Sequence, residues 1–347
     1  MQDQSEIPLK YTMSRAASHH ITIIGEGHRI QQDAALISAL VPLLQDADID
    51  MAVEVFPASE QARISALITA PNWSLETANS IMRSAEWPYE GYRDILHAAW
   101  AANRKAARSI AIVAIGPGSD WRDTLLPKGI SYDGFMADLV SKHLAQSRRG
   151  IVVYCGMHHA FTRYHQAELD DSGRATSYMD RMGNILWRRY GQAVFLIALH
   201  KPIWCGDWRE TSYCLPLGGR LDCAATKVGH PIGFDILGTP MADLSFGATE
   251  YYSYGHPTVR LADYADGYVW SGPVESYRHV AIIPLDQYAP SPEALDEVAR
   301  ENPFNDEKGV SIKRLRTIWS QELEASRDIA AKVGWKHLAA WQAACSR

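Results

Sequence analysis

The segment ITIIGEGH at residues 21–28 is an apolar, mostly β-branched run that leads directly into a Gly-x-x-His motif. A second segment, IVVYCGMHH at residues 151–159, repeats this arrangement. Such runs predict buried strands, and a glycine at the strand end lets the backbone turn sharply. Because open α/β sheets bind ligands at the carboxyl ends of their strands, the two motifs predict a functional site at one sheet edge.

Strand-like and helix-like segments alternate between residues 20 and 200. Apolar residues at helical spacing follow the first motif over 31–48, and further strands are predicted at 50–56, 109–115 and 193–199. This alternation predicts an α/β fold with a mostly parallel, doubly wound sheet and helices on both faces. We expect residues 1–200 to form this core, with a helical cap at about 58–108.

The last third of the chain differs in composition, with frequent glycine, proline and aromatic residues. We expect residues 201–347 to form an extension that packs on the core and completes the same domain. Strand-like pieces occur at 267–270 and 279–283, and a charged amphipathic helix is predicted at 311–333.

Composition narrows the classes of function. The chain has 347 residues and a formal net charge of −6, which disfavours a nucleic-acid groove or an anionic membrane surface. No apolar run approaches the roughly 18 residues of a membrane span, and the polar N-terminus lacks a signal-peptide core. The five cysteines include no Cys-x-x-Cys, so we expect a cytoplasmic protein with mostly free thiols, Cys205, Cys214 and Cys223 among them. The oligomeric state stays open.

Three residues of the first half are candidates for chemistry. Glu26 and His28 lie two residues apart just past a strand end, a pairing that suits general acid–base work on water or shared metal ligation. Glu54 interrupts the strand MAVEVF, and a carboxylate buried there must be paired, hydrogen-bonded or bound to a metal. The alternative for Glu54 is an outward position on an edge strand.

The second motif adds further candidates. His159 occupies the Gly-x-x-His position, and of the adjacent His158 and His159 we expect one to bind while the other packs or orients. Arg163 either neutralises an oxyanion or is a surface arginine. Tyr92 follows the aromatic segment WPYEG and either reaches the site mouth or packs in an aromatic cluster.

The order IIGEGH, AVEV and VYCGMHH resembles the TIKI superfamily, which includes erythromycin esterases, ChaN-type haem-binding proteins, TraB-like proteins and TIKI proteases. The resemblance covers roughly residues 20–200. It implies a site made of Glu26, His28, Glu54 and His159. In the proteases such residues bind a divalent metal, whereas in the esterases they activate water without one. Esterase-like members carry an arginine where this chain reads SYDGF at 131–135, which weakens the case for esterase activity.

From these observations we expect a hydrolase that acts on an ester or amide of a moderately large small molecule. Glu26 with His28 would activate water, directly or on a divalent metal (Mn, Fe or Zn) held by His28, Glu54 and His159. Arg163 would take the developing negative charge, and Tyr92 and His158 would contact the substrate. The alternatives are a haem- or metal-binding protein or a redox metalloenzyme of the ChaN type, and a non-catalytic interaction protein.

Overall fold

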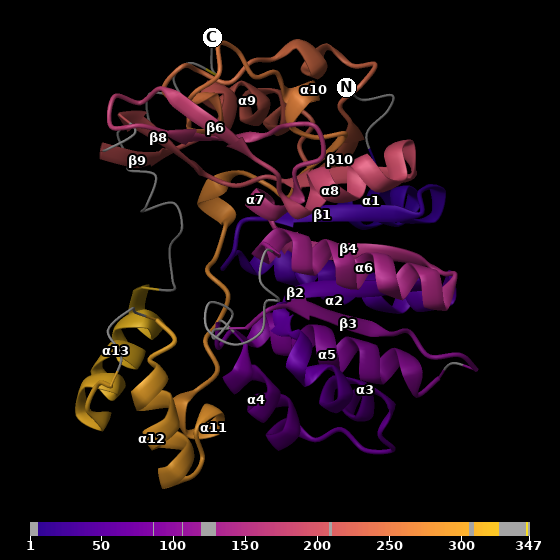
Figure 1. The fold of residues 1–347 in the computed structure, drawn as a ribbon, viewed down its shortest axis with the longest axis vertical. Coiled ribbons are helices and arrows are strands. Elements are labelled where there is room, and N and C mark those ends of the chain that lie inside the picture. The colour runs from indigo at the N-terminus through magenta and orange to yellow at the C-terminus, as the bar shows by residue number, and fades with distance from the viewer. Residues whose placement is uncertain are drawn as a thin grey trace. The chain divides into compact units, whose positions relative to one another are not determined.

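The computed structural model describes residues 6–85, 87–105, 107–118, 130–207, 210–304, 309–325 and residue 345. Seven strands form a mostly parallel sheet with helices around it (Figure 1). The predicted α/β class is therefore confirmed. Within the described ranges no helix is long and apolar enough to cross a bilayer.

The chain divides into two compact units. The first comprises Met1–Asp33, Gly150–Tyr277 and Asp328–Arg347, and the second comprises Ala34–Arg149 and Arg278–Arg327. The domain organisation expected from the sequence, a core at 1–200 completed by an extension at 201–347, stays a prediction.

The first unit is built on five strands in the order β10-β11-β7-β1-β4. Strand β1 is parallel to both β4 and β7, whereas β10 is antiparallel to β11. Every residue of β1 is buried, as expected of a central strand covered on both faces. The bounds of these strands are β1 Ile21–Glu26, β4 Gly150–Gly156, β7 Val194–Leu199, β10 Ile232–Asp235 and β11 Gly267–Trp270.

The register of β1 and β4 brings the two Gly-x-x-His motifs together. Ile21 lies opposite Ile151 and Glu26 lies opposite Gly156, so both strands reach their carboxyl ends at the same level (Figure 1). The short helix α7, Met157–Ala160, starts immediately after β4. This parallel pairing places both motifs at one edge of the sheet, as the sequence predicts.

The rest of the first unit is made of short elements. Two antiparallel hairpins, β5–β6 and β8–β9, follow the motif strands. The bounds are α1 Pro8–Ser18, β5 Gln166–Leu169, β6 Ala175–Met179, α8 Met182–Tyr190, β8 Ile203–Asp207, β9 Glu210–Cys214, α9 Arg220–Thr226 and α10 Leu261–Tyr264.

The second unit contains the parallel strands β2, Ile49–Pro57, and β3, Ile112–Gly116. Three helices occupy the segment for which a helical cap is predicted: α3 Gln61–Thr69, α4 Leu75–Ser84 and α5 Glu90–Asn103. The remaining helices are α2 Gln31–Asp46, which contains Pro42 and starts in the first unit, α6 Tyr132–Ser147, α11 Leu285–Tyr288, α12 Pro292–Glu301 and α13 Ile312–Ala325. Helix α13 agrees with the predicted amphipathic helix as far as residue 325, and residues 326–333 lie outside the described ranges.

The predicted strand at 279–283 is wrong. Only isolated pairing is present there, with Ile282 bridged to Tyr89 and backbone bonds from Glu90 N to Ala281 O and from Ile283 N to Pro88 O. The segment is apolar enough for a strand, but its partner is a loop rather than a second extended strand, and a ladder needs both.

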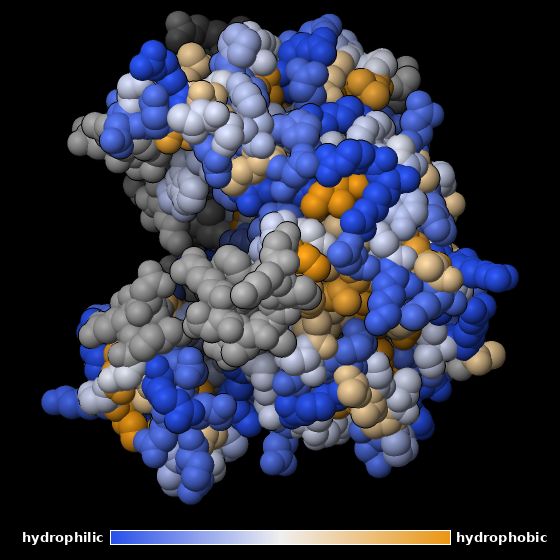
Figure 2. Space-filling view, in the orientation of Figure 1, coloured by the Kyte–Doolittle hydropathy of each residue, from blue (hydrophilic) through white to orange (hydrophobic). Residues whose placement is uncertain are grey.

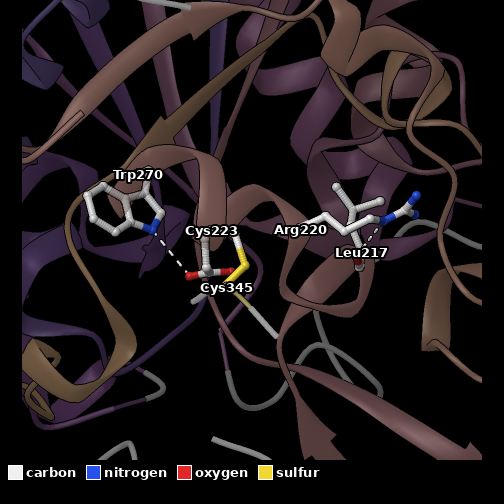
Figure 3. The surroundings of a disulfide bond; sticks show 6 residues. Leu217, Arg220, Cys223, Trp270 and Cys345 are labelled. Carbon is white, nitrogen blue, oxygen red and sulfur yellow. Dashed lines mark hydrogen bonds between the residues drawn. A yellow bond between two sulfur atoms is a disulfide. The ribbon is translucent and has the colours of Figure 1, made fainter. Parts of the chain in front are cut away.

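The expectation of unpaired thiols is wrong for Cys223. Cys223 of α9 forms a disulfide with Cys345, with Cα atoms 5.2 Å apart across a sequence separation of 122 residues (Figure 3). The other three cysteines are thiols. Spacing along the sequence cannot reveal this bridge, because pairing depends on where the two Cα atoms lie in space.

Candidate functional site

A Glu26–His28 dyad stands at the end of β1. Nδ1 of His28 lies 2.8 Å from Oε1 of Glu26. The Glu26 side chain is 4% exposed and that of His28 is 30% exposed, so a buried carboxylate orients an imidazole that solvent can reach. When the carboxylate is ionised, Nδ1–H is the donor, and the tautomer leaves the lone pair on Nε2. This is the arrangement of a histidine base with an acidic partner.

Glu26 is held on its second oxygen as well. The hydroxyl of Tyr154, a buried residue of β4, donates to Oε2. One carboxylate oxygen therefore contacts His28 and the other accepts from the neighbouring strand, and these two contacts together fix the orientation of the carboxylate. The imidazole itself packs over the next turn, since a Cβ added to Gly156 would lie 2.3 Å from His28 Nε2. Gly156 therefore leaves the space that the His28 ring occupies.

Two further titratable side chains, those of Lys201 and Asp33, lie beside the dyad. Nζ of Lys201, just after β7, is 3.5 Å from the backbone oxygen of Glu26, and Gly27 N–H donates to Oδ2 of Asp33 at 3.4 Å. Burial lowers the pKa of Lys201 to about 8, although the charges of Asp33 and Glu26 oppose this shift. Burial, and then the charge of Glu26, raises the pKa of Asp33 well above its usual range. The dyad thus has an ammonium group close by at neutral pH.

His158 faces an aromatic cluster. Its ring stacks on Tyr251 at 5.3 Å between centroids and 24° between planes. Burial lowers the pKa of His158 well below its usual value, and the positive charges of Lys201 and Arg181 lower it further. His158 is therefore a neutral imidazole at pH 7, in the electrostatic field of the dyad.

Arg163 has structural partners. Its Nη1 lies 2.7 Å from Oδ1 of Asp266, its Nη2 donates to the backbone oxygen of Ala262 at 3.1 Å, and its guanidinium lies over Trp187. Asp266 also accepts from the N–H of Leu196 on β7. These contacts tie the loop after α7 to the β7–β11 pair. The predicted oxyanion role of Arg163 stays a prediction.

Glu54 and Tyr92 belong to the second unit. Glu54 lies within β2 and is buried. Tyr92 of α5 is buried too, and its ring lies 6.2 Å from that of Tyr89 and 6.3 Å from that of Trp87. Tyr92 therefore takes part in the aromatic packing cluster that was its alternative role. The first unit brings together Glu26, His28, His158 and His159.

The described residues show no grouping that is typical of a metal site. Across the described part of the chain, no three or more histidine, cysteine, aspartate or glutamate side chains are grouped to hold a metal ion. The observed partner of His28 Nδ1 is the carboxylate of Glu26. We therefore derive no chemical step through a metal, and the predicted set of His28, Glu54 and His159 stays a hypothesis.

Sequence reasoning missed three residues of the dyad's surroundings. Tyr154 stands inside the second motif, where a tyrosine looks like an ordinary strand residue. Lys201 could have been found from the sequence, because it is a charged residue just past the end of a predicted strand, where site residues are expected. Asp33 lies in the first turn of α2, where an acidic residue is expected for helix stability alone.

A second buried polar network lies deeper in the first unit. Asp222 of α9 accepts from the indole N–H of Trp270 at 3.2 Å and lies 2.9 Å from Nε2 of His200 (Figure 3 shows Trp270 beside the disulfide). Nδ1 of His200 in turn lies 2.9 Å from the hydroxyl of Tyr268. All four side chains are buried, so the network holds β7, β11 and α9 together.

The sequence matches no protein-family model and no curated protein. Solved structures do share its architecture. A succinoglycan biosynthesis protein aligns at 10% identity with a TM-score of 0.55, over 78% of this chain and 95% of its own. A mutant of the erythromycin esterase EreC in its open conformation aligns at 12% identity with a TM-score of 0.50, over 76% and 92%. This chain has their fold.

A haem-binding ChaN of Campylobacter jejuni matches at 10% identity over 55% of this chain and 84% of its own, with a TM-score of 0.38. That similarity is too low to support an argument about function. The resemblance predicted from the two motifs is confirmed at the level of the fold by the erythromycin esterase.

Proposed function

We propose that this protein is a hydrolase in which the Glu26–His28 dyad activates water for attack on an ester or amide of a small molecule. The observation that carries the proposal is the 2.8 Å contact between Nδ1 of His28 and a carboxylate that is buried and held by Tyr154. A fixed carboxylate orients the imidazole and sets its tautomer, as an acidic partner does for other catalytic histidines.

The proposed reaction runs through His28. Nε2 takes a proton from water while the water oxygen bonds to the carbonyl carbon of the substrate. The tetrahedral intermediate then collapses, the bond to the leaving group breaks, and the imidazolium returns the proton to the leaving oxygen or nitrogen. Water is consumed, and an acid and an alcohol or amine are released. Glu26 stays ionised and stabilises the imidazolium.

The tetrahedral intermediate carries a negative charge on its oxygen, which a positive or hydrogen-bonding group nearby would stabilise. The ammonium of Lys201 lies close to Glu26, and the neutral imidazole of His158 belongs to the turn on which His28 packs. We assign electrostatic stabilisation to Lys201, because the guanidinium of Arg163 is engaged by Asp266. His158 keeps its proposed role as a substrate contact.

The titration of Lys201 predicts how kcat/KM depends on pH. Because burial lowers its pKa to about 8, the ammonium loses its proton above that pH, and we expect kcat/KM to fall as pH rises through 8. Lys201→Met should lack this alkaline limb and be roughly tenfold slower at pH 7. The check is a pH profile of kcat/KM from 6 to 10, with the exposed Lys227→Met as a matched control. An unchanged alkaline limb in Lys201→Met would remove Lys201 from the mechanism.

The direct test is a panel of alkyl and aryl esters, lactones and amides, assayed with protein that has been treated with a chelator and analysed for metals and visible absorbance. We expect hydrolysis of at least one class with far less than one metal per chain. One metal per chain whose removal abolishes turnover would establish a metalloenzyme instead. A Soret band without turnover would establish the haem-binding alternative.

The partner in this proposal is a small-molecule substrate, with no role for nucleic acid or a membrane. On the face drawn in Figure 2, hydrophilic residues predominate and hydrophobic ones occur in small groups. The cytoplasmic location stays a prediction. The Cys223–Cys345 disulfide argues against it, because disulfides are rare in cytosolic proteins.

A further inference from the structure

A cavity in the first unit is walled by aromatic rings. Its volume is about 340 Å³, within the range of small-molecule pockets. We call it the Trp204 pocket. It is lined by Tyr164, Gln166, Trp204, Tyr251 and Tyr254, together with two aliphatic side chains of β5.

The rings of the Trp204 pocket stand at steep angles to one another. Trp204 and Tyr251 are 5.2 Å apart with an interplanar angle of 81°, and Tyr251 and Tyr254 are 5.8 Å apart at 72°. Aromatic pairs favour offset-stacked and edge-to-face contacts. A planar ring bound here meets the face of one wall and the edge of the next, so it gains both kinds of contact at once. Trp204 is 41% exposed, which leaves its ring accessible.

The polar groups of the pocket argue against a sugar. Its only lining carboxamide among the described residues is that of Gln166. The amide N–H of Gln166 donates to the hydroxyl of Tyr251, and its oxygen accepts from Nη2 of Arg181 at 2.5 Å. A sugar ring carries several hydroxyls that need partners when buried, whereas in this lining the hydroxyl of Tyr254 already donates to the backbone oxygen of Gly206 and that of Tyr251 already accepts from Gln166.

The nearby charge argues against an organic cation, which an aromatic cage would otherwise suit. The described lining residues carry no charge, but Arg181 stands directly behind Gln166. Its positive charge reaches the pocket, because it opposes the effect of burial on the pKa of both Tyr251 and Tyr164. A cation in the pocket would be repelled by this guanidinium, whereas a neutral ring would not.

The pocket shares a wall with the candidate site. Tyr251, which lines the pocket, stacks on His158. Trp204 is also near the His158 ring, with 6.3 Å between centroids. His158 belongs to α7, which starts directly after Gly156, the residue over which His28 packs. A molecule in the Trp204 pocket therefore contacts Tyr251, and the other neighbour of Tyr251 is the turn that supports the dyad.

We propose that the Trp204 pocket binds a neutral, planar aryl ring and that this ring belongs to the substrate of the dyad. The second clause rests on the proposed hydrolase function, whereas the binding of the ring does not. The substrate class is then an aryl ester or amide, or an ester of an aryl acid.

The test compares 2-naphthol with decahydro-2-naphthol, its saturated counterpart, by isothermal titration calorimetry on the whole chain. We expect 2-naphthol to bind at least tenfold more tightly, because only the planar ring gains the aromatic contacts. Trp204→Ala should weaken 2-naphthol binding at least tenfold, while Trp204→Phe should stay within about threefold of the wild type. Leu237→Ala, which truncates another exposed apolar side chain of the first unit, should bind like the wild type.

The opposing outcomes are distinct. Equal affinity for the two naphthols, or binding that survives Trp204→Ala, would overturn the pocket assignment. Tighter binding of methyl glucoside or of phenyltrimethylammonium would overturn the choice of a neutral aryl ring. Ring binding that depends on Trp204, in a protein that hydrolyses nothing, would uphold the pocket and reject the hydrolase. Ester turnover without any binding of 2-naphthol would uphold the hydrolase and reject the pocket assignment.

Discussion

Glu26→Gln is expected to lower kcat/KM for ester hydrolysis about a thousandfold while the protein stays folded. The amide keeps the shape of the carboxylate, and its oxygen can still accept from Tyr154. The substitution removes the negative charge that stabilises the imidazolium of His28. It also removes the carboxylate acceptor that favours the tautomer with the proton on Nδ1. The measurement is kcat/KM on the best ester of the panel, together with a thermal melt.

The control for this variant is Glu6→Gln, which removes the charge of a partly exposed glutamate that pairs with the exposed Lys10. We expect that variant to keep full activity, because exposed pairs of this kind contribute little. His28→Ala should match Glu26→Gln in its loss, since residues that act as one unit give non-additive effects. Activity of Glu26→Gln within threefold of the wild type would remove the dyad from the mechanism.

The largest loss of stability is expected from Asp222→Ala. Asp222 is fully buried and accepts from Trp270, so truncation leaves the buried indole N–H without its partner and removes the carboxylate that lies 2.9 Å from Nε2 of His200. Breaking a buried network by removing one member costs about 3–5 kcal/mol in the free energy of unfolding. The measurement is a urea titration followed by circular dichroism and by tryptophan fluorescence.

Two further variants separate charge from hydrogen bonding. Asp222→Asn keeps an acceptor for the indole N–H and should lose less than the alanine variant. Asp243→Ala removes an exposed carboxylate 4.0 Å from Arg260 and should change the free energy of unfolding by less than about 0.5 kcal/mol. An Asp222→Ala protein as stable as Asp243→Ala would mean that the buried network contributes nothing to stability.

The strands that carry the two motifs could be predicted because their signals are local. A run of β-branched residues buried on both faces has few alternatives to a central strand, and β1 is buried along its whole length. The partnership of Glu26 with His28 was predictable for the same reason, since only Gly27 separates them along the chain. The strand at 279–283 failed because an apolar run does not supply its own partner.

The other contacts of the site join residues that are far apart in the sequence. Tyr154 reaches Glu26 from another strand, Arg163 turns to Asp266, and the Trp204 pocket combines residues of two hairpins with Tyr251 and Tyr254. Each of these side chains has several low-energy partners in an unfolded chain, and only packing selects one. The disulfide between Cys223 and Cys345 is of the same kind.

The amino-acid sequence alone therefore determined the class of fold, the sheet edge at which the motifs meet, and the Glu26–His28 pair, because hydrophobic periodicity and short-range geometry act within a few residues. The tertiary structure decided which groups hold the carboxylate, which charge lies beside it and where an aryl ring can bind. Those outcomes depend on burial, which shifts the pKa of Lys201 and of Asp33 and is a property of the whole packed unit.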